Sequence, residues 1–157
     1  MPYWRLFYHV VWATRQREPI IDAERADVIQ GAMRAACHEV GAVVHAVGIM
    51  PEHVHIALSV PPRVAIADMV QKLKGSSSHL LNHGELRREF DTFAWQSDYG
   101  VISFGERSLN QITTYVEHQA EHHGADNLWP SFELTERPHP SNNGKTRDEV
   151  ISPGRAS

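Results

Sequence analysis

The stretch that decides the fold of this chain is MPEHVHIALSV, residues 50–60. It starts with a turn and continues as a strand, because from residue 53 onward apolar side chains occupy every second position. One face of this strand is uniformly apolar and should meet a core, whereas the other carries two imidazoles beside small side chains. The apolar face holds Val54, Ile56, Leu58 and Val60, and the other holds His53, His55, Ala57 and Ser59.

The histidine pair of this strand predicts a metal site. His53 and His55 are two residues apart on a rigid element, and neutral imidazoles are good ligands for divalent metals. Ala57 and Ser59 leave room for a bound group on the same face. Taken alone, the pattern is weak, because a His-x-His pair on the solvent face of a sheet is ordinary.

The segments around this strand predict an alternation of strands and helices. Aromatic and β-branched residues indicate a strand over residues 3–14, and Asp22 and Gly41 are typical of the start and end of a helix between them. Residues 42–49 form a strand that should make a hairpin with residues 53–60. Further along, we expect a helix over 65–82, one or two strands within 92–105, and a helix over 108–123 capped by Ser108.

This order of elements favours an α+β fold. We expect a ferredoxin-like antiparallel sheet with helices on one face, plus a C-terminal helix. Residues 1–132 form one domain, and residues 133–157 read as a flexible C-terminal tail rich in Pro, Ser, Asn and Gly.

Composition limits the function classes. The chain of 157 residues has a formal net charge of −4, so any phosphate binding must come from local basic clusters. Its single cysteine, Cys37, excludes an internal disulfide and a cysteine-based zinc site. Apolar stretches are too short to cross a bilayer and no secretion signal is visible, so we expect a cytoplasmic protein with no membrane partner.

The helix expected over 108–123 carries a second group of chemically useful residues. On a helical wheel, Leu109, Ile112 and Val116 form the buried stripe. A polar ridge lies along the edge of that stripe, and Tyr115 and Gln119 are one turn apart on it. Either this is an ordinary amphipathic helix with a surface tyrosine, or Tyr115 is a nucleophile and Gln119 is an oxygen ligand of a metal held by His53 and His55. The second interpretation is chemically coherent, because a divalent cation polarises a phosphodiester for attack by a weak nucleophile.

Five motifs in this order resemble the single-tyrosine HUH transposases of insertion sequences, which move as single-stranded DNA. The resemblance covers residues 3–132. Its motifs are YWRLFYHVVWAT at 3–14, PEHVHI at 51–56, LKGSS at 73–77, WQ with YG at 95–100, and YVEHQAEHH at 115–123.

The resemblance implies a function and a site. His53, His55 and Gln119 would hold Mg²⁺ or Mn²⁺, and Tyr115 would attack a single-stranded DNA phosphate to give a 5′-phosphotyrosine link and a free 3′-OH. The enzyme would be a homodimer acting on DNA with hairpin ends, with the tyrosine placed in its own subunit or across the dimer.

Candidate DNA contacts are basic or hydroxyl-bearing residues, which bind phosphates. They are Arg5, Arg15, Arg17, Lys72, Lys74, Ser76 and His122. Glu52 alternates to the face opposite His53, so we expect it to make a turn or helix contact and not to ligate metal.

Two other functions stay open on the sequence. One is a non-cleaving, domesticated nucleic-acid-binding regulator with the same fold, although the presence of His53, His55, Tyr115 and Gln119 together favours the enzyme. The other is a metal hydrolase with a water nucleophile, in which Tyr115 would have no part.

Overall fold

The computed structural model describes residues 2–119 and 133–135. Its elements, in chain order, are β1 (Phe7–Ala13), η1 (Arg15–Arg17), α1 (Ala23–Val40), β2 (Val43–Ile49), β3 (His53–Ser59), α2 (Ile66–His83), β4 (Gly100–Phe104), η2 (Glu106–Ser108) and α3 (Leu109–Glu117). The four strands form one antiparallel sheet in the order β2-β3-β1-β4. The α+β, ferredoxin-like fold expected from the sequence is confirmed.

Local sequence signals explain the ends of α1 and the position of β3. The Asp22 side chain accepts a hydrogen bond from the backbone N–H of Arg25, which caps the first turn of α1. Gly41 ends the helix with φ of 78°, a left-handed conformation that favours glycine. The hairpin of β2 and β3 then places β3 inside the sheet, between β2 and β1, and every residue of β3 is buried.

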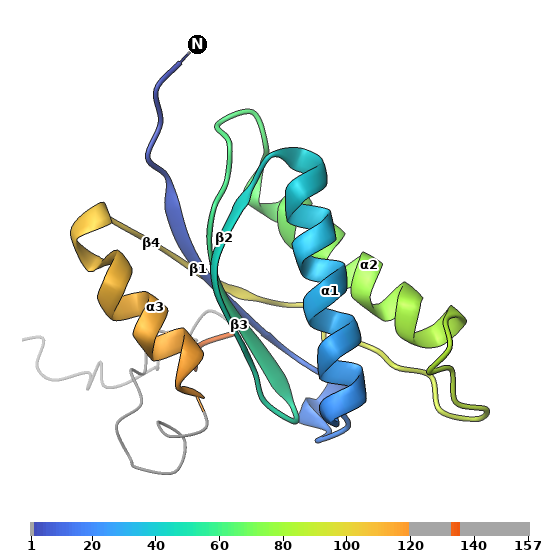
Figure 1. Ribbon diagram of the computed structural model, residues 1–157. Coiled ribbons are helices and arrows are strands. Elements are labelled where there is room, and N and C mark those ends of the chain that lie inside the picture. Colours follow the sequence, from blue (N-terminus) through green and yellow to red (C-terminus); the bar gives the residue numbers. More distant parts are fainter. Residues whose placement is uncertain (1, 120–132, 136–157) are drawn as a thin grey trace, which may run out of the picture.

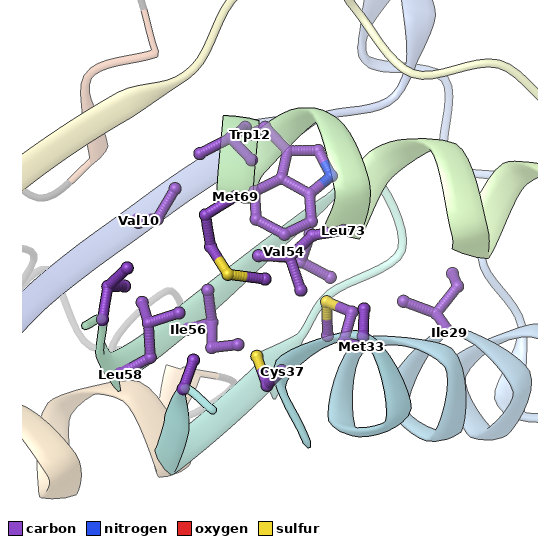
Figure 2. Close-up of a cluster of buried hydrophobic side chains, with 14 of the residues drawn as sticks. Val10, Trp12, Ile29, Met33, Cys37, Val54, Ile56, Leu58, Met69 and Leu73 are labelled. Atoms are coloured by element: carbon purple, nitrogen blue, oxygen red, sulfur yellow. The ribbon is translucent and has the colours of Figure 1, made fainter. Parts of the chain in front are cut away.

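The main core lies on one face of the sheet, under α1 and α2. Val54, Ile56 and Leu58 of β3 point into it, and Trp12 of β1 is fully buried among them (Figure 2). Met33 of α1 and Leu73 of α2 cover these side chains from the helix side. The core therefore uses the apolar alternation of β3 as the sequence predicts.

The opposite face of the sheet is covered by α3. Figure 1 shows α1 and α2 on one side of the sheet and α3 on the other, where α3 packs against β2 and β3. A smaller cluster holds this side together: Ala46, Ala57, Ile112, Tyr115 and Val116. The face with His53 and His55 is thus an interior surface and not a solvent face.

Two predicted strand regions are shorter in the structure than the sequence suggests. The strand expected over 3–14 begins at Phe7, because both partner strands end there, at Ser59 and Phe104. Within 92–105 the regular strand covers only Gly100–Phe104, and Trp95 makes an isolated bridge with Thr14.

Ser108 makes no side-chain cap hydrogen bond. It ends the short helix η2 with helical backbone angles, whereas a capping serine needs an extended backbone, and α3 starts after it, at Leu109. Among the helices of the described residues, none has the length and apolar character of a bilayer-spanning segment.

Candidate metal and nucleophile site

The two imidazoles of β3 lie together beneath α3. Both His53 and His55 have 0% exposed surface, and their ring centroids are 5.0 Å apart. The Nδ1 of His53 donates a hydrogen bond of 2.9 Å to Oε1 of Glu52. The Glu52 side chain thus contacts His53 itself, and this contact orients the His53 ring, whose other nitrogen, Nε2, lies 3.8 Å from Oε2 of Glu133.

His9 of β1 orients the second imidazole in the same way. The Nε2 of His9 and Nδ1 of His55 share a hydrogen bond of 2.7 Å, and both rings are buried. Burial, with a smaller contribution from the charge of His55, lowers the pKa of His9 to about 3, although Glu133 acts in the opposite direction. His9 is therefore neutral at physiological pH. Its hydrogen bond to Nδ1 of His55 directs the other nitrogen of His55, Nε2, away from His9.

A row of residues across the sheet explains how other segments reach this pair. His55 lies opposite Gly48 of β2 and opposite Val11 of β1, and Val11 lies opposite Gly100 of β4. A Cβ at Gly48 would come within 2.1 Å of the carbonyl oxygen of Val116, and a Cβ at Gly100 within 1.7 Å of that of Leu134. Both glycines are required because the backbone of α3 and that of residues 133–135 contact the sheet there.

Tyr115 is buried beside the histidines. Its exposed fraction is 1%, and its ring centroid lies 6.2 Å from that of His55 and 6.4 Å from that of His9. The helical wheel predicts Tyr115 on a polar ridge at the edge of the buried stripe. In the structure Tyr115 lies within that stripe, with Ile112 and Val116. The surface-tyrosine interpretation is wrong for this reason, and the tyrosine reaches the histidine pair of its own chain.

Gln119 lies one turn further along, against β2. It is 2% exposed, and its Nε2 donates a hydrogen bond of 2.8 Å to the backbone carbonyl of Tyr115. Its Cγ would lie 2.9 Å from a Cβ at Gly48, the residue opposite His55 in the sheet. The structure thus brings Gln119 to the neighbourhood of the pair with its amide nitrogen engaged by α3.

Glu133 joins this group, although the sequence assigned it to the tail. Its Oε1 accepts a hydrogen bond of 2.5 Å from the Tyr115 hydroxyl, and its Oε2 lies 3.2 Å from Nε2 of His55 and 3.8 Å from Nε2 of His53. Burial alone would raise the pKa of Glu133. Hydrogen bonds from His55 and Tyr115, together with the charges of His55 and His53, outweigh burial and lower that pKa to about 2. The only sequence signal for this residue is its position between Phe132 and Leu134 in a polar region.

These donors fit a divalent cation. One ligand atom from each of His53, His55 and Glu133 lies within 4.8 Å of the other two. Two imidazole nitrogens and a carboxylate oxygen match the ligands that divalent transition metals and Mn²⁺ accept. A carboxylate also suits Mg²⁺, which usually binds through a few protein oxygens and keeps further positions for water or phosphate.

The candidate DNA contacts lie away from this cluster or are bound within the protein. Lys72 pairs with Glu39 at 2.9 Å, and the Lys74 ammonium donates to the carbonyls of Gln96, Ser97 and Asp98. Both belong to α2, on the other face of the sheet. Ser76 on the same helix donates to the carbonyl of Leu73.

The remaining basic candidates are at the surface or outside the described part. Arg5 pairs with Glu106, and Arg15 and Arg17 are exposed on η1. His122 lies outside the described residues.

Comparison with known proteins gives relatives of one kind. A curated relative, the ISDra2 transposase TnpA of Deinococcus radiodurans, is 30% identical over 119 residues, which cover 74% of this chain and 85% of that protein. The transposase of insertion sequence element IS200 from Salmonella typhimurium is 27% identical, over 75% of this chain and 79% of its own length.

Solved structures agree with these sequence relatives. A crystal structure of a putative transposase from Deinococcus radiodurans superposes with a TM-score of 0.59 at 28% identity, over 76% of this chain and 95% of that one. A REP-associated tyrosine transposase bound to a REP hairpin also gives a TM-score of 0.59, over 97% of this chain and all of that one. At 11% identity, the second likeness shows the fold alone.

The family model described as "Transposase IS200 like" matches residues 2–119. That range includes the strand with both histidines and the helix with Tyr115, and it ends at Gln119. With a match over this much of the sequence, the chain belongs to the IS200-like transposase family.

Proposed function

We propose that this transposase cleaves and rejoins single-stranded DNA with Tyr115 as its nucleophile, at a divalent-metal site built on His53 and His55. The observation that carries the proposal is the burial of Tyr115 beside His55, with 6.2 Å between the ring centroids. A tyrosine used only for packing would not need its hydroxyl directed at a carboxylate that also contacts both imidazoles.

The proposed ligands are His53, His55 and Gln119, and the proposed ion is Mg²⁺ or Mn²⁺. When bound, the cation would polarise a DNA phosphate, so that a weak nucleophile such as the phenol of Tyr115 could attack it. Glu52 and His9 hold the two imidazoles in place through their Nδ1 atoms. The side-chain amide of Gln119 also donates a hydrogen bond to the backbone carbonyl of Tyr115, which fixes the proposed ligand relative to the proposed nucleophile.

The proposed step exchanges one phosphodiester for another. The Tyr115 oxygen bonds to phosphorus, the bond from phosphorus to the 3′ oxygen breaks, and that oxygen leaves as a 3′-OH with a proton in place of the one the phenol loses. The 5′-phosphate stays on Tyr115, so a 3′-OH at a new junction can reverse the reaction without ATP.

The proposed substrate is single-stranded DNA with hairpin ends, since one structural neighbour, a REP-associated tyrosine transposase, is bound to a REP hairpin. Because two DNA ends must be cut and exchanged, we propose that the enzyme works as a homodimer with two such sites. Light scattering of the purified protein tests the dimer.

The experiment incubates the protein with single-stranded hairpin DNA and Mn²⁺ and looks for a denaturant-resistant protein–DNA adduct. We expect the adduct for the unchanged protein and its loss in Tyr115→Phe. The matched control is Tyr3→Phe, because Tyr3 is 87% exposed, lies outside the strands, and loses the same hydroxyl. Cleavage without an adduct would indicate a water nucleophile, and a mobility shift without cleavage would indicate a non-cleaving binder; either contradicts the proposal.

A further inference from the structure

We propose that Glu133 is an additional protein ligand of the divalent cation, and that the same carboxylate holds the phenol of Tyr115. This inference rests on the proposed function, and it adds to the histidines a charged ligand from the segment that follows α3. Figure 1 shows residues 133–135 as a short orange-red segment beside α3 and β3.

The two oxygens of this carboxylate have different contacts. Oε2 faces the imidazoles, at 3.2 Å from Nε2 of His55 and 3.8 Å from Nε2 of His53. Oε1 accepts the hydrogen bond from Tyr115. The carboxylate of Glu133 would therefore connect a cation bound among the three ligand atoms to the hydroxyl of Tyr115.

Both imidazoles are oriented toward this carboxylate from behind. Glu52 engages Nδ1 of His53, and His9 engages Nδ1 of His55. In both rings it is the remaining nitrogen, Nε2, that approaches Glu133. This pattern of outer contacts is typical of metal-binding histidines, whose second nitrogen is engaged by a carboxylate or another polar group.

The position of Glu133 is built into the sheet. The carbonyl oxygen of the next residue, Leu134, would lie only 1.7 Å from a Cβ atom placed on Gly100. Gly100 is linked to His55 through Val11, which pairs with both. A close backbone approach of this kind requires glycine, so the segment that carries Glu133 has a defined seat on β4, with β1 between it and the histidine strand.

Charge supports the same assignment. The side chain of Glu133 is 17% exposed, and an ionised carboxylate that far from water needs positive partners. Two neutral imidazoles and an amide oxygen bring no charge to a dication, whereas Glu133 supplies one negative charge.

The test measures Mn²⁺ affinity directly, by titration calorimetry and by the paramagnetic resonance signal of free Mn²⁺, with and without a single-stranded oligonucleotide. We expect Glu133→Ala and Glu133→Gln each to weaken Mn²⁺ binding by about tenfold or more, because even residues that only support a ligand change metal affinity by roughly 10–100-fold. The matched control is Glu117→Gln, which removes the same charge from an exposed position of α3 and should bind Mn²⁺ like the unchanged protein.

A second variant moves the carboxylate without removing it. Gly100→Ala displaces the carbonyl of Leu134, so we expect weaker Mn²⁺ binding in the same direction as for Glu133→Ala. Circular dichroism melting of each variant identifies any that have lost the fold, and Glu133→Gln, which preserves shape, is the variant that decides. Unchanged Mn²⁺ affinity in folded Glu133→Gln and Glu133→Ala would overturn the inference.

The inference and the proposed function can fail separately. If the unchanged protein binds Mn²⁺ and forms the Tyr115 adduct while the Glu133 variants bind Mn²⁺ normally, only the assignment of Glu133 fails. If the unchanged protein binds no Mn²⁺ with or without DNA, the metal-dependent function fails and the assignment of Glu133 fails with it.

Discussion

The two faces of the central sheet are both buried, but they are built from different chemistry. On β3, Ile56 and Leu58 face α1 and α2 within a continuous apolar core (Figure 2), whereas His53 and His55 face α3. The first face has large interlocking side chains, and the second has two glycines that admit backbone from elsewhere in the chain. One strand thus supplies core side chains on one side and the proposed metal ligands on the other, held in register by the same backbone.

The largest difference between the two faces is expected when two neighbouring residues of β3, one on each face, are substituted. His55→Ala should abolish Mn²⁺-dependent adduct formation, because it removes a proposed ligand that His9 holds in place. Ile56→Ala should reduce the free energy of unfolding by roughly 2–5 kcal/mol, as expected for loss of a buried aliphatic side chain, with adduct formation retained below the melting temperature. Denaturant melts and adduct assays on both variants check this, and abolished chemistry in folded Ile56→Ala would contradict the division between faces.

A second pair of substitutions tests the approach of α3. Gly48→Ala puts a methyl group 2.1 Å from the carbonyl of Val116, so α3 must shift, at a loss of about 1–3 kcal/mol in stability and most of the adduct yield. The control is Gly31→Ala, at an exposed position of α1 where an added Cβ atom has no neighbour within 4 Å. That change should stabilise the protein by roughly 0.5–1 kcal/mol and leave the chemistry unchanged. Normal adduct yield in Gly48→Ala would show that the position of α3 does not depend on this close contact.

The histidine pair was predictable because alternation along β3 is a local property of the sequence. Burial of Tyr115 was not, since it depends on Gly48, a residue of another strand that allows α3 to contact the sheet. Glu133 was the hardest to predict. It reaches His53 across eighty residues of chain, and its seat is a glycine in β4 with no conspicuous motif of its own. Order and type of the main elements followed from periodicity and caps, whereas strand ends depended on where the partner strands stop.

A smaller effect is expected at Glu52, behind the histidine face. Glu52→Gln weakens the hydrogen bond that orients His53, so Mn²⁺ affinity should fall by roughly 10–100-fold while the fold is kept. Glu18→Gln, at an exposed position, is the charge-matched control. Calorimetric titration with Mn²⁺ checks this, and equal affinities for the two variants would remove Glu52 from the set of supporting residues.

The smallest effect is expected on the apolar face, at Cys37. Burial raises the pKa of its thiol to about 11, with the charge of Arg34 acting weakly in the opposite direction. The thiol is therefore protonated at pH 8, and alkylating reagents should not modify it until the core opens. Mass spectrometry before and after denaturation measures this, and rapid modification of the native protein would mean that the core beneath α1 is open to solvent.

The most direct test of the central claim is anomalous scattering from crystals soaked with Mn²⁺. We expect one strong peak between Nε2 of His53 and Nε2 of His55, within ligand distance of both and close to Glu133 and the Tyr115 hydroxyl. A peak elsewhere, with no density between the two imidazoles, would contradict it.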